Sequence, residues 1–244
     1  MAAGAAAGPG PAALPAFFEW QAPEDWRMVD FISDLHLAEA MPRTFEAWAA
    51  HLRHTPADAV VILGDLFEGW VGDDVRERPF ERRCMEVMAE AASHRTLAFM
   101  VGNRDFLFGT AAVRAAGMMA LADPTVLDAW GRRLLLSHGD ALCLDDVPYQ
   151  AFRRQVRSTA WQQAFLARPL AERLQVAAEA VHWLHAMGAA ELIHGHTHRP
   201  GSAALAPGYK RHVLSDWDLD GADRAEVLRL TRGGLQRVAP ERGR

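Results

Sequence analysis

Five short apolar runs recur along this 244-residue chain, and each one leads into a cluster of polar residues. Short runs of apolar and β-branched residues bounded by glycine are typical of buried strands. Functional side chains of α/β proteins gather at the carboxyl ends of such strands. We therefore expect a sheet whose strand ends carry the function. The runs lie at 28–33, 59–63, 96–101, 133–137 and 191–193.

Longer segments with helical spacing of apolar residues separate these runs. Helices are predicted at 43–53, 79–94, 147–158 and 159–188, with Pro169 interrupting the last. A hairpin is predicted at 125–137, with its turn near Trp130–Gly131. Further strands are predicted at 212–218, 225–234 and 235–240. Alternating strands and helices followed mainly by strands indicate a layered α/β sandwich.

One domain is expected over residues 26–238, because no linker or internal repeat divides the chain. Residues 1–25 are rich in Ala, Pro and Gly and are predicted to form a flexible N-terminal tail that the fold does not need. A similar C-terminal tail is predicted at 239–244.

Composition narrows the class of protein. The net charge of −5 does not favour nucleic-acid binding, which needs a basic surface. Two cysteines are too few for a secreted disulfide scaffold and indicate reduced thiols in a cytoplasmic protein. No apolar run reaches the roughly 18 residues of a membrane-spanning helix, so no such helix is expected.

The polar clusters after the five runs contain side chains that bind metal ions. Asp and His at positions two apart lie on one face of a strand end, so both can reach one point. Carboxylate, imidazole and amide oxygen suit Mn, Fe or Zn, and no thiolate is present. The predicted ligands are Asp34, His36, Asp65, Asn103, His138, His196 and His198.

Seven ligands exceed the four that one tetrahedral ion takes. They suit two ions about 3.5–4 Å apart that share a bridging carboxylate, and Asp65 is the natural bridge. His194 is expected only to shape the pocket. Each motif alone would more often be a turn or a satisfied polar residue. Their joint occurrence after five strands favours a metal centre.

The order of these motifs from Phe31 to Pro200 resembles that of the calcineurin-like metallophosphoesterases. The resemblance implies an αββα sandwich of two mixed sheets with a dimetal site at the strand ends. The stretches "FISDLHL", "ILGDLFEGWVGDD", "GNRDFLFG", "SHGDALCLDD" and "IHGHTHRP" are similar to the UDP-2,3-diacylglucosamine diphosphatase (hydrolase) family of lipid A biosynthesis.

Membership of that family would imply hydrolysis of the pyrophosphate bond of UDP-2,3-diacylglucosamine to 2,3-diacylglucosamine 1-phosphate (lipid X) and UMP. A water activated by two Mn²⁺ ions would attack the α-phosphorus. The enzyme would associate peripherally with the cytoplasmic face of the inner membrane, and no protein partner is predicted.

The resemblance also assigns roles to single residues. One ion would be held by Asp34, His36, Asp65 and His198, and the other by Asp65, Asn103, His138 and His196. Catalytic roles would fall to Asp65, Asn103, Arg104 and His196. Substrate contacts would come from Asn103, Arg104, Asp146 and His196, and residues 67–74 would form part of the pocket wall.

The helical lid insertion, at about 147–187, departs from the family pattern. A basic block that family members carry after a position near Ala178, and that grips the glucosamine, is absent here. Apolar side chains of the lid are candidates for an acyl-chain chamber or for helix packing: Tyr149, Phe152, Trp161, Phe165 and Leu166. Basic ones are candidates for lipid headgroup contacts or for a solvated helix face: Arg153, Arg154, Arg157 and Arg168.

Two alternatives stay open at this point. The shortened lid favours a related calcineurin-like phosphoesterase that acts on another phosphodiester or nucleotide pyrophosphate. A non-enzymatic scaffold of the same fold is the second alternative, and it predicts missing ligands, whereas all seven are present.

Overall fold

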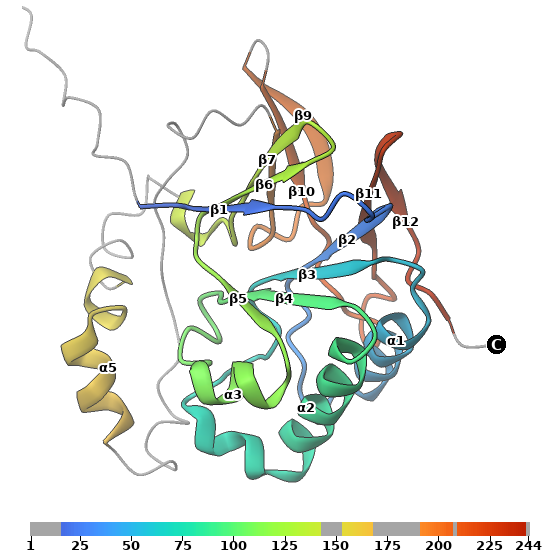
Figure 1. Ribbon diagram of the computed structural model, residues 1–244. Helices are drawn as coiled ribbons and strands as arrows, with labels where there is room; N and C mark the ends of the chain where they lie inside the picture. The colour runs from blue at the N-terminus through green and yellow to red at the C-terminus, as the bar shows by residue number, and fades with distance from the viewer. Residues whose placement is uncertain (1–15, 143–152, 168–190, 207–208, 243–244) are drawn as a thin grey trace, which may run out of the picture.

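Two mixed six-stranded sheets face each other in the computed structural model, which describes residues 16–142, 153–167, 191–206 and 209–242 (Figure 1). The first sheet has the order β12-β11-β2-β3-β4-β5 and the second the order β1-β6-β7-β8-β10-β9. The first sheet consists of β2 (Met28–Ile32), β3 (Ala59–Leu63), β4 (Thr96–Met100), β5 (Met119–Leu121), β11 (Val227–Thr231) and β12 (Gly234–Val238). The second consists of β1 (Phe18–Gln21), β6 (Thr125–Ala129), β7 (Arg132–Leu136), β8 (Glu191–His194), β9 (Gly201–Ala206) and β10 (Tyr209–Val213).

Helices cover the outer face of the first sheet (Figure 1). They are α1 (Pro42–His54), α2 (Pro79–Ala92) and α3 (Thr110–Ala115), with the 3₁₀ turn η1 (Asp73–Glu77) before α2. Proline at the first position of α1 and of α2 suits a helix start, because its missing N–H would be unpaired there anyway. The predicted helices 43–53 and 79–94 are therefore confirmed with small shifts of their ends.

Alternation along β3 explains why its sequence is apolar throughout. Ala59, Val61 and Leu63 belong to the core between the two sheets, together with residues of β7 and β8. Val60 and Ile62 belong to the core under the helices. Because side chains of a strand alternate between its faces, a strand buried on both faces reads as a continuous apolar run.

Parallel pairing brings the ends of the predicted strands to one place. β2, β3 and β4 pair in parallel in the first sheet, and β7 and β8 pair in parallel in the second. The carboxyl ends of parallel neighbours lie at the same edge of a sheet. The α/β sandwich of two mixed sheets, expected from the sequence, is confirmed.

The predicted N-terminal tail contains part of the fold. Residues 18–21 form β1, which pairs in parallel with β6 at one edge of the second sheet. Trp20 is buried between the sheets and lies edge-on to Trp26, with ring centroids 5.6 Å apart. The prediction of a dispensable tail at 1–25 is wrong for this stretch, because a strand pairing across more than 100 residues leaves no local sequence signal.

The predicted C-terminal tail is also anchored through residue 241. Arg229 of β11 donates to the Glu241 carboxylate at 3.2 and 3.3 Å and to Asp30 at 2.7 and 2.9 Å. The Glu241 backbone N–H donates to Nδ1 of His51 on α1 at 3.2 Å. Because Asp30 is fully buried, the guanidinium that neutralises it fixes the end of the chain as well.

Other predicted elements have mixed outcomes. The hairpin 125–137 is confirmed as β6 and β7, and Trp130 and Gly131 have the positive φ of a tight turn. The strand predicted at 212–218 ends at Val213, since the chain then turns back and the Trp217 N–H donates to the Asp34 carbonyl at 3.0 Å. The short elements β5, α3 and β9 escaped prediction.

The lid is described only in part. Of the helix predicted at 159–188, the structure describes α5 (Thr159–Leu166), whose Phe165 is 2% exposed and stacks on Trp161. Of the two alternatives for Phe165, helix packing therefore agrees with the structure better than an acyl-chain chamber does. Leu166 is 43% exposed and is not part of that packing. Residues 143–152 and 168–190, which include Tyr149, Phe152, Arg168 and most of the predicted lid, lie outside the described residues.

In the described part of the chain, no helix combines the length and the apolar character needed to cross a membrane.

A test of the β1 correction is the replacement Trp20→Ala. We expect it to lower the free energy of unfolding by about 3 kcal/mol, because it opens a cavity between the sheets. Urea unfolding followed by tryptophan fluorescence or circular dichroism measures the change. The control Phe18→Ala, on the same strand but 46% exposed, is expected to cost under about 1 kcal/mol. Equal stability of the Trp20 variant and the parent would restore the tail interpretation.

Candidate metal centre

Predicted ligands occupy sharp turns directly after the parallel strands. Asp34, His36, Asp65, His196 and His198 all have φ between 49° and 63°, which side-chain-bearing residues seldom adopt. Backbone hydrogen bonds hold these turns: the Asp34 N–H donates to the Gly64 carbonyl at 3.1 Å, and the His36 N–H to the Asp65 carbonyl at 3.0 Å. The backbone therefore accepts strain where it must aim side chains at one point.

Two glycines let neighbouring loops come into contact. A Cβ on Gly195 would lie 2.0 Å from Oδ2 of Asp34, and one on Gly102 would lie 2.2 Å from Oδ1 of Asp65. Such distances are far below van der Waals contact, so any side chain there would displace a predicted ligand. The glycines of "GNRD" and "HGHTH" thus serve close approach to the two carboxylates.

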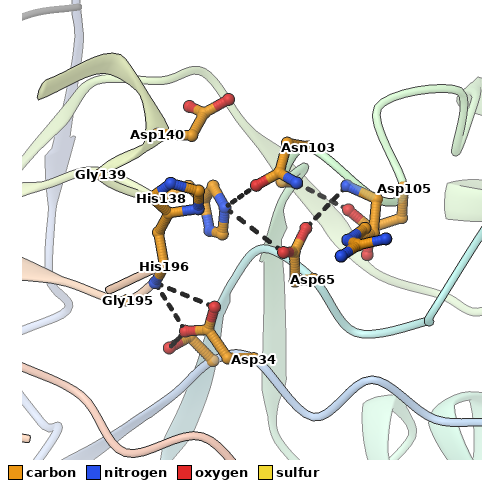
Figure 2. A network of polar contacts seen from close by, with 12 residues as sticks. Asp34, Asp65, Asn103, Asp105, His138, Gly139, Asp140, Gly195 and His196 are labelled. Atoms are coloured by element: carbon orange, nitrogen blue, oxygen red, sulfur yellow. Dashed lines mark hydrogen bonds and ion pairs between the residues drawn. The ribbon is translucent and has the colours of Figure 1, made fainter. Parts of the chain in front are cut away.

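The ligand candidates form two groups of three. Asp34, His36 and His198 each offer one ligand atom, and these atoms lie within 4.8 Å of one another. Asp65, His138 and His196 form a second group by the same measure. Figure 2 shows the second group between Asp34 and the loop that carries Asn103.

Asn103 lies beside the second group. Its Oδ1 is 3.1 Å from Nε2 of His138, and the same imidazole nitrogen is 3.7 Å from Oδ2 of Asp65. The structure therefore brings all seven predicted ligands together where strands of both sheets end. Asp65 belongs to the second group, and its role as a bridge to the first stays a prediction.

Acceptors on the outer side of the imidazoles orient them. Nδ1 of His138 lies 2.8 Å from the carbonyl of Leu63, and Nδ1 of His36 lies 3.0 Å from Oε2 of Glu68. Nδ1 of His198 faces Asp216 at 3.7 Å. With a proton on Nδ1, each imidazole leaves its Nε2 lone pair free for the interior of the site, as in metal-binding histidines.

Nε2 atoms then face one another and the carboxylates. Nε2 of His36 lies 3.2 Å from Nε2 of His198, which in turn lies 3.3 Å from Oδ1 of Asp34. Two imidazole lone pairs this close to a buried carboxylate suit a shared cation. The residues present, with oxygen and nitrogen donors only, fit a pair of Mn, Fe or Zn ions.

Charge in the site favours cations. Burial lowers the pKa of His138, but the carboxylates of Asp65, Asp140 and Asp34 outweigh burial and raise that pKa to about 9. Burial and then the charge of His138 lower the pKa of His196 to about 4, so His196 is neutral near pH 7. A proton on His138 thus occupies a place where a metal ion would supply the positive charge.

Two further buried carboxylates are satisfied by the protein itself. Asp105 accepts from the backbone N–H groups of Leu66 and Gly102, each at 2.7 Å, and burial, followed by the charge of Asp65, raises its pKa to about 6. Asp140 accepts from Arg153 and Arg157. Burial opposes its charge, but Arg157, His138 and Arg153 lower its pKa to about 2.

Arg153 and Arg157 therefore bind Asp140 and are not free for lipid headgroups. Arg157 also donates to the Gly102 carbonyl at 3.1 Å, which ties the segment before α5 to the loop of Asn103. Arg154, in contrast, is exposed.

Other predicted site residues have different outcomes. The Arg104 backbone N–H donates to Oδ1 of Asp65 at 2.8 Å, and its guanidinium, 35% exposed, lies 3.3 Å from Oε1 of Glu68. His194 belongs to neither ligand group, and its Nδ1 lies 2.8 Å from the Gly195 carbonyl. Asp146 lies outside the described residues.

The sequence-based prediction missed the residues that orient the histidines. Glu68 lies within "FEGW", and Asp216 lies in the stretch predicted as a strand at 212–218. A signal existed for Glu68, which follows Asp65 by three residues in a ligand-bearing loop. Asp216 carries no such signal, because only the folded chain brings it to His198.

Comparison with known proteins gives concordant matches. A family model described as calcineurin-like phosphoesterase matches residues 28–204. A protein from Chromobacterium violaceum named UDP-2,3-diacylglucosamine hydrolase is 40% identical over 239 residues, covering 85% of this chain and 97% of that protein. A protein of the same name from Ralstonia nicotianae is 42% identical over 243 residues, covering 85% of this chain and 90% of that protein.

Among solved structures, a dimetal phosphatase from Danio rerio has a TM-score of 0.46 at 13% identity, covering 89% of this chain and 99% of that one.

Replacing Asp65 by Ala is expected to lower the bound metal to one ion or fewer per chain, because its carboxylate is predicted to serve both positions. Metal analysis after dialysis of the manganese-loaded protein measures the loss. Asp128→Ala, which removes a carboxylate from β6 away from the site, is the control and should retain two ions. Retention of two ions by the Asp65 variant would refute the bridge.

Proposed function

The chain belongs to the calcineurin-like phosphoesterase family, and on that premise we propose that it hydrolyses the pyrophosphate bond of UDP-2,3-diacylglucosamine. The products are UMP and 2,3-diacylglucosamine 1-phosphate, and the pathway is lipid A biosynthesis. The observation that carries the proposal is the convergence of two ligand groups at the strand ends of both sheets, in a chain 40% identical to a protein of that name.

The proposed cofactor is a pair of Mn²⁺ ions, for which the fold provides candidate ligand groups. One ion is assigned to Asp34, His36, Asp65 and His198, and the other to Asp65, Asn103, His138 and His196. When bound, such ions neutralise the phosphoryl oxygens and make water a better nucleophile near neutral pH. Oxygen and imidazole donors without thiolate support manganese.

Residues of the chain position the phosphate for attack by water. The Arg104 guanidinium, partly exposed beside Glu68, binds a phosphoryl oxygen with its planar donors. Asn103 offers an amide N–H₂ to the same phosphate while its oxygen faces His138. The His196 backbone N–H donates to both oxygens of Asp34, at 2.9 and 2.8 Å. These bonds fix the position of the His196 backbone and therefore restrict where its imidazole can reach.

Hydrolysis then exchanges one bond at phosphorus for another. Water forms a bond to the α-phosphorus, and the bond from that phosphorus to the bridging oxygen breaks in line. The bridging oxygen leaves with the lipid phosphate, and the proton released by water leaves the site.

We place the protein at the cytoplasmic face of the inner membrane, as a peripheral protein. Exposed Arg154 and exposed Leu166 frame the segment around α5 and support this location. Exposed cationic and apolar side chains on one segment suit an anionic lipid surface.

A second candidate is hydrolysis of another phosphodiester or nucleotide pyrophosphate. The match with the C. violaceum protein is 239 positions long and takes in 85% of this chain, about 207 residues, so about 30 positions of the match have no counterpart in this chain. That difference agrees with the short lid predicted from the sequence. A shorter lid would contact less of the lipid half of the substrate, which favours a broader range of substrates.

Turnover in ¹⁸O-labelled water tests the proposed reaction. The manganese-loaded protein should cleave UDP-2,3-diacylglucosamine, and mass spectrometry should find the label in UMP, because water attacks the α-phosphorus. Nucleotide sugars and bis(p-nitrophenyl) phosphate are the comparison substrates. Label in the lipid phosphate would contradict α-attack, and preferential cleavage of a comparison substrate would favour the second candidate.

Arg104→Ala is expected to lower kcat/KM by about 10- to 100-fold while metal content survives, because it removes a charge-assisted hydrogen bond to phosphate. Steady-state kinetics and metal analysis on the same sample measure both effects. Arg114→Ala, an exposed arginine of α3, is the control. Loss of both ions in the Arg104 variant would show that the residue supports the metal centre instead.

A further inference from the structure

A pocket of about 350 Å³ opens beside the metal centre, on the side of His36 and Glu68. The side chains that line it include the apolar Leu37, Phe67 and Val71 and the charged Arg78 and Glu81. Its volume lies at the lower end of the range of small-molecule sites. None of the candidate metal ligands lines this pocket, so metal binding does not account for it.

Three loops that carry predicted ligands continue directly into the pocket wall. Leu37 follows His36, and its N–H donates to the Leu66 carbonyl at 2.9 Å. Glu68 follows Asp65 by three residues, and its N–H donates to the Leu37 carbonyl at 3.3 Å. The pocket is therefore continuous with the metal centre through its backbone.

Arg104, next to Asn103, completes this connection. Its guanidinium lies 3.3 Å from Glu68, whose other carboxylate oxygen lies 3.0 Å from His36. Both Arg104 and Glu68 line the pocket. A molecule whose phosphate lies on Arg104 therefore has the pocket directly beside it.

Glu81 gives the pocket a chemical preference. It lies in the first turn of α2 and is 9% exposed. Its Oε1 pairs with Arg78 at 3.2 Å, whereas its Oε2 is buried and has no hydrogen-bond partner among the described residues. A carboxylate in a first helical turn benefits from the helix dipole, but that interaction leaves a buried oxygen unsatisfied. Because Glu81 also lines the pocket, its carboxylate is placed to accept hydrogen bonds from a ligand with hydroxyl donors.

We propose that this pocket binds the nucleoside half of the substrate, with Glu81 accepting hydrogen bonds from the ribose hydroxyls. A carboxylate acceptor is the common partner of a ribose diol in nucleotide sites. The apolar side of the pocket, formed by Leu37, Phe67 and Val71, suits the pyrimidine ring. This inference rests on the proposed function, because it assigns one half of that substrate.

The lipid half fits this pocket poorly. Acyl chains would have to desolvate Glu68, Glu81 and the guanidinium of Arg78 without hydrogen-bonding to them. The acylated sugar is also one phosphate further from the attacked α-phosphorus than the ribose is. The space that directly adjoins the metal centre is therefore the place for the nucleoside.

Calorimetric titration of the full chain loaded with manganese tests the pocket through binding, independently of turnover. UMP and inorganic phosphate are the two probes, because both can occupy the metal centre but only UMP carries a nucleoside. UMP is expected to bind more tightly than phosphate. Glu81→Gln is expected to weaken UMP binding by about 10-fold with the Kd of phosphate unchanged, since a neutral amide accepts hydrogen bonds more weakly than a carboxylate.

A second variant fills the pocket without touching Glu81. A Cβ on Gly69, which lines the pocket, meets no atom within 4 Å, so Gly69→Phe can fold and project into the space. It is expected to abolish the preference for UMP over phosphate. Gly201→Phe is the matched control, because its Cβ is equally unobstructed and it lies on β9, and it should retain the preference.

Failure of this inference is distinguishable from failure of the proposed function. Equal affinities of UMP and phosphate in the parent, or an unchanged ratio in both pocket variants, would overturn the nucleoside site even if the lipid substrate is cleaved. A preference for UMP that the pocket variants remove supports the site even if UDP-2,3-diacylglucosamine is not turned over, in which case the proposed function alone falls.

Discussion

The site depends on a backbone that holds five metal-ligand candidates in a conformation that such residues avoid. Within the described residues, seven non-glycine residues have positive φ, and five of them are predicted ligands. Each costs of order 1 kcal/mol or more relative to a relaxed backbone. The sandwich supplies the compensation through buried parallel strands, whose hydrogen bonds fix the origin of every turn. If the strand ends were less rigidly held, these loops would return to a relaxed backbone conformation and the candidate ligands would no longer point to one place.

Four buried carboxylates in and around the site differ in the groups that they pair with. Asp105 and Asp140 are satisfied by the chain, through backbone N–H groups in one case and two arginines in the other. Asp34 and Asp65 also accept backbone N–H groups, from His196 and Arg104, but among the described residues no arginine pairs with them and histidine imidazoles face them. Burial of uncompensated carboxylates is costly. The site therefore reserves two negative charges for ions from outside and uses the other two to hold its loops and the segment before α5.

The sequence was informative where a local pattern carries the meaning. Apolar runs that end in Asp, Asn or His predicted the strand ends and the seven clustered ligands, because strand burial and ligand chemistry are both local properties. It failed for β1, whose edge pairing with β6 is decided by tertiary contacts. It also failed for Glu241 and for Asp216, which act on residues distant in sequence. Residues that orient the candidate ligands from distant positions in the sequence are the part of a site that one sequence alone does not reveal.

Chemistry and selectivity have separate structural origins in this molecule. The ligand groups come from the sandwich itself, at the ends of strands that the core fixes on both faces. The wall beside them comes from residues 67–71 and from the start of α2, where buried side chains such as Phe67 and Val71 belong to the core and Glu68 and Arg78 are more exposed. Substitutions in this wall can change what is bound next to the phosphate without moving the ligands. Because Glu68 and Arg104 belong to both parts, a change in either one alters binding and chemistry together.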